Sequence, residues 1–534
     1  MKKAKVLMIQ GTGSQVGKSL IVAAFCRIFA KDGYKVAPFK SQNMSLNSFV
    51  AKDGEMARIQ VLQAMAACVE PTVDMNPILL KPKKTEKEFQ LIIRGKPYCD
   101  FTVDDYWVHG KFVPLLTYVI EESLERLKSE FDVIVIEGAG CPADIYIKAS
   151  VVNMKTAEMA EAPVFLVADI SCARGGTLAS IVGVHELLDE DSRNRIRGVI
   201  INKWEGDIAF LKPCFSIIEE KTGWPVVGAI PHINGLVLPD EDSVGLMERT
   251  IDHAGIKVEI AVIRLPLISN FTDFHPLEIE PNVKVNFVRS TRELGSPDAI
   301  IIPGTKNTIQ DFQWLKQSGF AEKIVDLARR GVPVMGICGG FQMLGKDLVD
   351  EKGIEGGFPT NIRGLGLLDV STKFDFYDKT INQLEAEIIG SGVIFDQVKG
   401  QKIIGYEIHM GSSVLGEKAN PIFQVIEHGG NRFNRLDGAC DPSGLIFGTY
   451  LHGLFDDPPL RQALVKFLSA KKQLKTSVHR EENIHEIWEE SLDRLAEIVK
   501  ANTDMRKLYE LIGLSPTQAL KESKASKKDE MNRT

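Results

Sequence analysis

Short apolar runs, rich in Val and Ile, recur through the first part of the chain, and each is bounded by Gly, Pro or Asp. The longer intervals between them carry apolar residues at helical spacing, as in residues 20–33. Strands that are apolar on both faces and alternate with amphipathic helices predict an α/β domain with a mostly parallel sheet covered on both sides. We place this domain at residues 1–235, with strands expected at 5–9, 35–39, 132–140, 162–170, 197–204 and 225–231.

The same alternation starts again after residues 236–257, which we interpret as a linker. Strands are expected at 257–266, 283–289, 298–307 and 332–340, and a β-rich stretch follows at 405–455. We therefore expect a second α/β domain over residues 258–465. Leu and Ile then recur at helical spacing up to residue 512, so residues 466–534 are expected to form a helical extension and a flexible tail.

Composition and charge exclude several classes of protein. Of the 534 residues 44% are hydrophobic, which is enough for more than one buried core. The net charge is -7 and no basic stripe occurs that could neutralise a run of phosphates, so we expect no nucleic-acid partner. The eight cysteines form no CxxC pair, which argues against disulfides or a zinc site and favours a reducing, cytoplasmic compartment. No apolar stretch approaches the roughly 18 to 20 residues of a membrane helix, so we expect a soluble protein with no membrane partner.

The strongest local motif is GTGSQVGKS, which stands directly after the first expected strand and before the first expected helix. Glycines let such a loop point successive N–H groups at phosphate oxygens, Lys18 can reach the terminal phosphates, and Ser19 can bind magnesium. A glycine turn that binds no nucleotide is the alternative. The motif predicts a phosphate loop whose ATP-binding residues are Gly11, Thr12, Gly13, Ser14, Gln15, Val16, Gly17, Lys18 and Ser19.

Two carboxylates are candidate partners of that magnesium ion, Mg2+. Glu137 ends a buried strand, where a charge is costly unless it meets a cation, although a carboxylate that caps the next helix is the alternative. Glu55 opens an expected helix beyond a loop that we expect near the phosphates, and its alternative is a first-turn acid favoured by the helix dipole. The predicted magnesium ligands are Ser19, Glu55 and Glu137.

Polar residues also cluster at the ends of two other expected strands. The segment after the second strand is dense in Ser, Asn and Gln, which favours Lys40, Gln42 and Asn43 as contacts to a substrate or a phosphate. An ordinary polar loop is the alternative for each of them. Asn202 ends the strand GVIIN and is a candidate to bind an adenine edge, but Asn also caps strands for structural reasons.

In the second domain, GICGG predicts a strand-to-helix elbow with Cys338 at its apex. The flanking glycines permit a strained turn, and the helix N-terminus lowers a thiol pKa, which is the environment that a nucleophile requires. The other seven cysteines lack this setting. We therefore predict that Cys338 is a nucleophile rather than a small buried apolar residue.

A cysteine nucleophile needs a histidine, which can be distant in sequence. His452 in GTYLHGLF follows the last expected strand and is our choice, with His409 in GYEIHMG as the competitor. The strand-end turn PGTKN can donate N–H groups near Gly304 to an oxyanion, together with the N–H of Gly339.

Taken together, these motifs resemble the cobyric acid synthases, the glutamine-dependent amidotransferases of the cobalamin pathway. The segments GTGSQVGKS, KSQNMSLNSF, DGEMARIQVLQA, NPILLKP, VIEGAG and VIINKWEGD are similar to the dethiobiotin-synthetase-like ATPase domain of that family. The segments PGTKN, GICGGFQMLG, GYEIHMG and GTYLHGLF are similar to its class I glutaminase domain. The resemblance spans about residues 5–465.

The resemblance implies an ATP- and Mg2+-dependent ligase with L-glutamine and a corrinoid as substrates. ATP would convert a carboxylate of adenosylcobyrinic acid a,c-diamide into an acyl phosphate, and ammonia released from glutamine at Cys338 and His452 would displace the phosphate. Repetition at the b, d, e and g carboxylates would give adenosylcobyric acid.

Two segments depart from the expected patterns. DISCARGG is looser than the family form, which leaves the roles of Asp169 and Arg174 open. His452 is followed by Gly-Leu rather than Pro-Glu, so the usual third carboxylate of a class I glutaminase is missing there and another group has to orient the imidazole. Alternative functions are cobyrinic acid a,c-diamide synthase, a cell-wall amidating ligase, and a P-loop switch ATPase, which would leave Cys338 and His452 unexplained.

Overall fold

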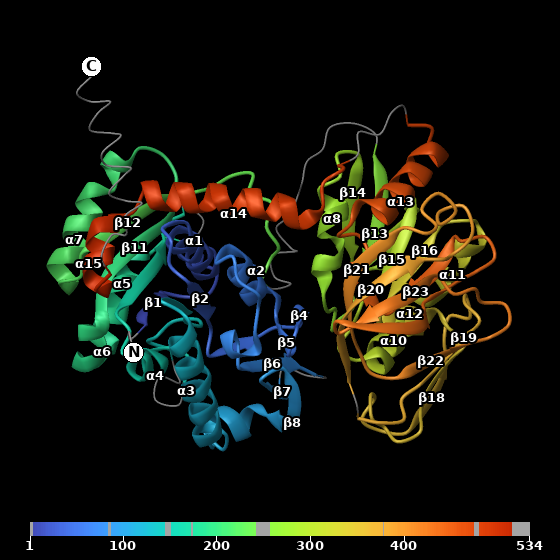
Figure 1. Cartoon of the computed structure of the whole chain (residues 1–534), viewed down its shortest axis with the longest axis horizontal. Coiled ribbons are helices and arrows are strands. Elements are labelled where there is room, and N and C mark those ends of the chain that lie inside the picture. Colours follow the sequence, from blue (N-terminus) through green and yellow to red (C-terminus); the bar gives the residue numbers. More distant parts are fainter. Residues whose placement is uncertain are drawn as a thin grey trace.

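The chain forms two α/β lobes that lie side by side along its long axis (Figure 1). The computed structural model describes residues 4–83, 87–144, 151–171, 175–241, 257–377, 379–474 and 480–514. We call residues 4–241 together with 484–512 the first lobe, and residues 257–474 the second lobe.

A six-stranded sheet, parallel throughout, forms the centre of the first lobe. Its order is β12 (Val226–Pro231), β11 (Ile196–Trp204), β10 (Val164–Asp169), β1 (Lys5–Gly11), β9 (Val133–Glu137) and β2 (Val36–Phe39). Leu7 packs into the apolar core on one face and Met8 into the core on the other, because neighbouring side chains of a strand point to opposite faces. Both faces are therefore buried, which is why these strands are continuously apolar, and the expected parallel α/β fold is confirmed.

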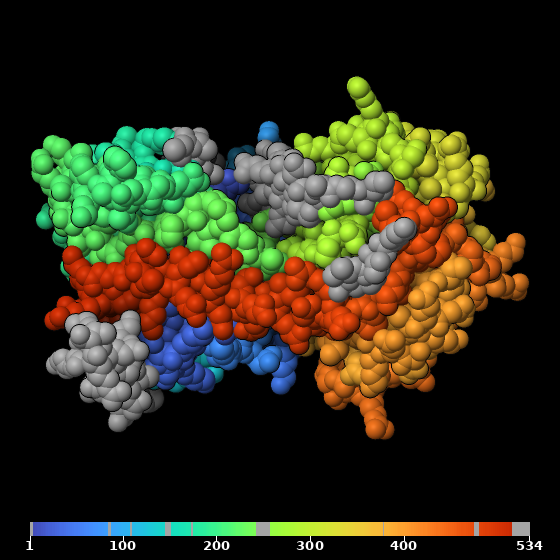
Figure 2. Space-filling view, turned by 90° about the horizontal axis from the view of Figure 1, so that it is seen from above, coloured from blue at the N-terminus to red at the C-terminus, as the bar shows by residue number. Residues whose placement is uncertain are grey.

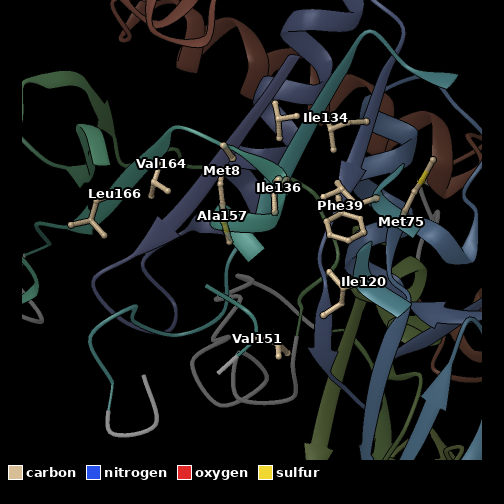
Figure 3. Packing of buried hydrophobic residues seen from close by; sticks show 14 of the residues in the cluster. Met8, Phe39, Met75, Ile120, Ile134, Ile136, Val151, Ala157, Val164 and Leu166 are labelled. Atoms are coloured by element: carbon tan, nitrogen blue, oxygen red, sulfur yellow. The ribbon is translucent and has the colours of Figure 1, made fainter. Parts of the chain in front are cut away.

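Helices cover both faces of this sheet. The face that carries Met8, Ile134 and Ile136 is packed by helices α3, α4, α5 and α7, and Figure 3 shows part of this core. The other face is packed by α1, α2 and the C-terminal helices. The helices of residues 4–241 are α1 (Lys18–Lys31), α2 (Arg58–Ala66), α3 (Val113–Glu130), α4 (Met154–Ala160), α5 (Thr177–Leu187), α6 (Glu190–Arg195) and α7 (Lys212–Thr222).

An insertion between β2 and α3 extends the first lobe towards the second lobe (Figure 1). It contains the sheet β3 (Gln42–Met44), β6 (Ile78–Pro82), β7 (Glu88–Ile93) and β8 (Lys96–Thr102), and the hairpin β4 (Ser48–Ala51) and β5 (Gly54–Ala57). A cavity of about 1040 Å³ lies between this hairpin and the second lobe. Short turns of helix are η1 (Val73–Met75), η2 (Asp104–Val108) and η3 (Ile208–Phe210).

The second lobe has its own six-stranded sheet, which is parallel except for its last strand. Its order is β14 (Val283–Val288), β13 (Val258–Ile263), β15 (Ala299–Ile302), β16 (Val334–Ile337), β26 (Ile446–Thr449) and β25 (Ala439–Cys440). Its helices and short helical turns are η5 (Phe271–Phe274), α8 (His275–Glu278), α9 (Thr291–Leu294), α10 (Thr308–Gln317), α11 (Phe320–Arg329), α12 (Gly339–Leu344) and α13 (Pro458–Lys471).

Two smaller sheets account for the β-rich stretch. One has the order β18 (Thr360–Arg363), β17 (Asp347–Asp350), β19 (Val370–Lys373) and β22 (Ser412–Leu415). The other is antiparallel, with the order β24 (Asn431–Asp437), β23 (Phe423–His428), β20 (Thr380–Ile388), β21 (Lys402–His409) and β27 (Leu451–His452). Its inner side chains share an apolar core with β13 and α13.

The C-terminal helices return from the second lobe to the first. Helix α14 (Ile484–Ala501) lies along one side of the molecule, and α15 (Met505–Ile512) follows it. Figure 2 shows this segment as a continuous red band across the molecule. Leu492 is fully buried in a core shared with α1, and Lys500 Nζ donates to Asp32 Oδ1 at 2.7 Å. The part of the expected extension from Ile484 to Ile512 thus belongs to the first lobe, whereas residues 466–471 are the end of helix α13 in the second lobe. The tail that we expect after residue 514 lies outside the described residues.

Among the described residues no helix combines the length and the apolarity needed to cross a membrane. The cysteines that the structure describes are all free thiols.

The packing of α14 leads to a stability prediction. Leu492→Ala should lower the free energy of unfolding by about 2–5 kcal/mol, because it leaves a cavity between α14 and α1. Urea unfolding measures the loss, and hydrogen exchange should report weaker protection of α1. The matched control is Glu497→Ala on the exposed side of α14, which should change neither quantity. Equal exchange in α1 for both variants would show that α14 does not stabilise α1.

Candidate active site

The predicted phosphate loop, residues 11–19, joins β1 to α1 at the carboxyl end of the first sheet. Gly17 has φ +97°, and a Cβ there would lie 2.2 Å from Nδ2 of Asn202, so only glycine fits. Lys18 Nζ donates to the carbonyl of Gly13 at 2.8 Å and to that of Gly140 at 3.3 Å. Burial lowers the pKa of Lys18. The loop therefore encloses its lysine. In a phosphate-binding site, phosphate oxygens would replace these two carbonyls as the partners of Lys18.

Asn202 supports the phosphate loop directly. Its Nδ2 donates to the carbonyl of Val16 at 2.9 Å. The neighbouring Lys203 donates to the carbonyl of Gln15 at 2.7 Å and pairs with Asp169 at 3.0 Å. Asp169 therefore helps to hold the loop through Lys203, while Arg174 lies outside the described residues.

Oxygen atoms converge beside the loop in a group that fits magnesium. Ser19 Oγ lies 2.8 Å from Oε1 of Glu137 and 2.7 Å from Oε2 of Glu241. Mg2+ prefers such hard oxygen ligands, and it usually takes one or two carboxylates together with substrate phosphates. The predicted pair Ser19 and Glu137 is thus brought together, and Glu241 joins it from the segment that we interpreted as a linker.

Lys40 lies in the same cluster. Its Nζ donates to Glu137 at 2.8 Å and to Glu241 at 2.7 Å. Burial by itself lowers the pKa of Lys40, but the two carboxylates outweigh burial and raise it. Gln63, which the sequence did not suggest, donates to Oε2 of Glu137 at 2.5 Å. The strand ends of β2 and β9 therefore present one compact group of charges beside the phosphate loop.

Glu55, the third predicted magnesium ligand, is not brought together with Ser19 and Glu137. It belongs to strand β5, and helix α2 begins only at Arg58, so the expectation that Glu55 opens a helix is wrong. The reason is the β4–β5 hairpin, which pairs Glu55 with Val50. The Glu55 carboxylate forms ion pairs with Lys81 and, at 2.6 Å, with Lys379. Burial by itself raises the pKa of Glu55, but the two lysines outweigh burial and lower it to about 2.

Gln42 and Asn43 are buried on strand β3, close to Lys40 in sequence. Oε1 of Gln42 accepts a hydrogen bond from the Tyr106 hydroxyl. Nδ2 of Asn43 donates to Oε1 of Gln60 at 2.9 Å. Their predicted substrate contacts are not tested by these hydrogen bonds and stay predictions.

In the second lobe, Cys338 occupies the predicted elbow between β16 and α12. Its φ of 53° and ψ of -111° are strained for a residue with a side chain. Gly340 makes this turn possible, because a Cβ there would lie 1.9 Å from the carbonyl oxygen of Ile302. The thiol is buried, and Sγ lies 3.6 Å from the carbonyl of Ile408. The turn thus holds the sulfur at the start of a helix in a closed site.

His452 and Asp273 form a buried pair beside this elbow. Nδ1 of His452 lies 2.7 Å from Oδ2 of Asp273, and the second carboxylate oxygen of Asp273 accepts the N–H of Gly453 at 3.1 Å. Among the described residues Nε2 of His452 has no oxygen or nitrogen partner, which leaves it for the Cys338 sulfur. The order Cys338, His452, Asp273 is the geometry of a nucleophile, a base and an orienting carboxylate.

The charges of this group favour an imidazolium. Burial by itself lowers the pKa of His452, but Asp273 and then Cys338 outweigh burial and raise it to about 10. His452 therefore carries a proton at neutral pH, and its positive charge lies beside the Cys338 sulfur.

Asp273 is a residue that sequence reasoning missed. It lies on η5, far from His452 in sequence, in the segment FTDFHP. No local pattern marks an aspartate in such a turn as a histidine partner. Only the packing of η5 against β27 brings the two side chains together.

The predicted oxyanion turn, residues 303–307, lies against the elbow. A Cβ on Gly304 would be 3.2 Å from Cε1 of His452, and a Cβ on Gly339 would be 2.7 Å from Cγ2 of Thr305. The hydroxyl of Thr305 donates to Asp311 at 2.5 Å, which holds the turn. The backbone near Gly304 and Gly339 thus surrounds the space beside the sulfur and the imidazole.

The competing histidine has other partners. The ring of His409 stacks on Tyr450 with centroids 3.7 Å apart, and its Nε2 lies 3.6 Å from Glu407. Glu407 also pairs with Arg435 and His428. These contacts favour His452 over His409 as the partner of Cys338.

Comparisons with known proteins agree with this division into two lobes. Residues 7–242 match the CobQ/CobB/MinD/ParA nucleotide binding domain, and residues 259–460 match the CobB/CobQ-like glutamine amidotransferase domain. Over 96% of its length the chain is 47% identical to a cobyric acid synthase of Pelotomaculum thermopropionicum, of which 97% is covered. It is 48% identical to a probable cobyric acid synthase of Methanococcoides burtonii over 96% of the chain and 98% of that relative.

The ion pair of His452 leads to a prediction about pH dependence. Asp273→Asn keeps the shape but removes the charge that raises the pKa of His452, so the imidazolium should be lost well below pH 10. The rate of Cys338 alkylation by iodoacetamide, measured against pH, should fall at neutral pH because the thiolate loses its partner. Asp326→Asn, which changes a carboxylate on the surface of α11, is the control and should alkylate as the wild type does. An identical profile for Asp273→Asn would exclude the carboxylate as the cause.

Proposed function

The chain belongs to the cobyric acid synthase family of glutamine-dependent ligases, and we propose that it amidates the b, d, e and g carboxylates of adenosylcobyrinic acid a,c-diamide to give adenosylcobyric acid. The observation that carries this proposal is the presence in one chain of a phosphate-loop lobe and a Cys338–His452–Asp273 lobe, over a length shared with the family. A switch ATPase would need only the first of these lobes.

In the glutaminase half-reaction, the Cys338 thiolate attacks the side-chain amide carbon of L-glutamine. The backbone N–H groups near Gly304 and Gly339 stabilise the oxyanion, and His452 gives its proton to the departing ammonia. The glutamyl thioester that remains is then hydrolysed by water, which His452 deprotonates while Asp273 holds the ring. Glutamate leaves and the thiolate is restored.

In the synthetase half-reaction, a corrinoid carboxylate oxygen attacks the terminal phosphorus of ATP, and ADP leaves. Lys18 and the loop N–H groups would bind the transferred phosphoryl group, and Lys40, which pairs with Glu137 beside the loop, would meet the incoming carboxylate. Ser19 and Glu137 would hold Mg2+, which neutralises charge on the phosphates. Ammonia then attacks the acyl phosphate carbon, phosphate leaves, and the nitrogen loses a proton.

The separation of the two sites leads to a test by ammonia rescue. Cys338→Ser should abolish glutamine-dependent synthesis but retain synthesis with concentrated ammonium salt at alkaline pH, because the phosphate site is intact. Mass spectrometry of the corrinoid measures this, since each amidation lowers the mass by about one dalton, from the replacement of OH by NH2.

Two histidine variants serve as the comparison in the same assay. His452→Ala should behave as Cys338→Ser does, whereas His409→Ala should retain substantial glutamine-dependent synthesis. Our choice of His452 as the base would be contradicted if His409→Ala, and not His452→Ala, lost glutamine-dependent synthesis while keeping ammonia-driven synthesis. Glutamine-driven synthesis by Cys338→Ser would exclude Cys338 as the nucleophile.

The two predicted carboxylate ligands can be separated by their magnesium dependence. Glu137→Gln should raise the Mg2+ concentration needed for half-maximal ATP turnover by about 10-fold or more, because it removes a charged ligand beside Ser19. Glu55→Gln is the matched substitution, and its Mg2+ requirement should stay at the wild-type value because Glu55 is paired with lysines. If only Glu55→Gln raised the Mg2+ requirement, Glu55 and not Glu137 would be the magnesium ligand.

A further inference from the structure

A short segment of the first lobe, residues 46–50, lies against the glutaminase site of the second lobe. We call it the bridging segment. It runs from the loop after strand β3 into strand β4 of the β4–β5 hairpin, and its residues Asn47 and Ser48 are buried. Nε2 of Gln383 in β20 donates to the carbonyl of Val50 at 2.9 Å. The segment is thus held between the two lobes.

Ser48 closes a ring of hydrogen bonds with two residues of the second lobe. Its N–H donates to Oδ1 of Asn270 at 3.2 Å, Nδ2 of Asn270 donates to the Tyr406 hydroxyl at 3.1 Å, and that hydroxyl donates to the carbonyl of Ser48 at 3.2 Å. Asn270 has φ +50° and is 2% exposed, and Tyr406 is also 2% exposed. A strained, buried residue of this kind persists only where its surroundings hold it.

The ring of Tyr406 packs against the imidazole of His452. Tyr406 is the cross-strand neighbour of His452 between β21 and β27, and the two rings are stacked with centroids 5.2 Å apart and planes 15° apart. Phe49 of the bridging segment packs on the Tyr406 ring at 4.8 Å. Asp273 fixes Nδ1 of His452, whereas Tyr406 fixes the tilt of the ring.

Asn47 makes the second connection between the lobes. Its Oδ1 accepts from the Thr272 hydroxyl at 3.1 Å, and Thr272 directly precedes Asp273 in η5. Its Nδ2 donates to the carbonyl of Asp240 at 3.2 Å. The next residue, Glu241, contacts Ser19 of the phosphate loop. A single buried side chain therefore touches the turn that carries the orienting carboxylate and the segment that reaches the nucleotide site.

From these contacts we infer that the first lobe completes the glutaminase site, with Tyr406 as a positioning residue for His452 and with Asn47 and Ser48 holding Tyr406 and η5 in place. This inference rests on the proposed roles of Cys338 and His452. The imidazole is oriented for proton transfer only when both its partners, Asp273 and Tyr406, are fixed. Tyr406 is anchored directly to Ser48, and Asp273 is anchored through its neighbour Thr272, which contacts Asn47. Glutamine hydrolysis thus depends on the docking of the bridging segment.

The test compares two single variants, each of which removes the hydroxyl of a tyrosine that bridges the lobes. Tyr406→Phe keeps the stacked ring but breaks the ring of hydrogen bonds with Ser48 and Asn270. We expect kcat for glutamine hydrolysis to fall by about 10-fold with an unchanged KM, because a small misplacement of the base slows chemistry without removing a substrate contact. The pH profile of Cys338 alkylation should shift, and ammonia-driven synthesis should stay at the wild-type rate.

Tyr377→Phe is the matched control. Its hydroxyl also bridges the lobes, since it accepts from Gln90 at 2.7 Å and donates to Asp100 at 3.3 Å, but these two partners are remote in sequence from η5 and β27. It should leave glutamine hydrolysis and the alkylation profile unchanged. If Tyr406→Phe matched Tyr377→Phe in both readouts, the inference would be overturned, while loss of glutamine use in Cys338→Ser would still support the proposed function.

A double-mutant cycle tests the contact between Asn47 and Thr272. Thr272→Val removes the hydroxyl with little change of shape, and it should slow glutamine hydrolysis in the wild-type background. In the Asn47→Ala background the same change should have little further effect, because the partner is already absent. Strictly additive losses would show that this contact does not carry the link between the lobes. Circular dichroism of each variant establishes that the comparison is made between folded proteins.

Discussion

Both active centres depend on one constraint, which is that charged or strained residues at the carboxyl ends of buried parallel strands need partners from elsewhere in the fold. Both faces of the first sheet are covered, so Glu137 at the end of β9 is withdrawn from water and is paired with Lys40, Gln63 and Ser19. In the second sheet, the strained turn after β16 presents Cys338, and His452 with Asp273 supplies its charge partner. In each lobe the fold provides the site because the strand end alone cannot stabilise its own reactive group.

The two lobes are joined by more than the segment between their sheets. Helix α14 starts next to the second lobe and packs along α1, so the described residues after 480 run from the second lobe back to the first. The insertion after β2 provides a second connection, through the bridging segment and the ion pair of Glu55 with Lys379. The proposed reaction uses in the first lobe the ammonia that is released in the second lobe.

Local motifs predicted the phosphate loop and the elbow at Cys338, because the chemistry of both is built by residues that are neighbours in the chain. A phosphate loop needs glycines, a lysine and a serine within a few residues, and GTGSQVGKS contains them all. The elbow around Cys338 is likewise defined by adjacent glycines, and a Cβ at Gly340 would collide with Ile302. The apolar strands and amphipathic helices predicted both sheets for the same reason, since periodicity is a local property.

The sequence by itself predicted the α/β class, the phosphate loop and the elbow at Cys338, because each depends on contiguous residues, whereas it left His409 open as the competitor of His452. Only the tertiary structure decided which group orients His452, since Asp273 is far from it in sequence. It also placed Glu241 beside Ser19 and gave Glu55 two lysine partners, one of them Lys379 in the other lobe. Such partners are set by how the lobes pack, and a carboxylate in a turn has no local pattern that reveals which distant cation it will meet.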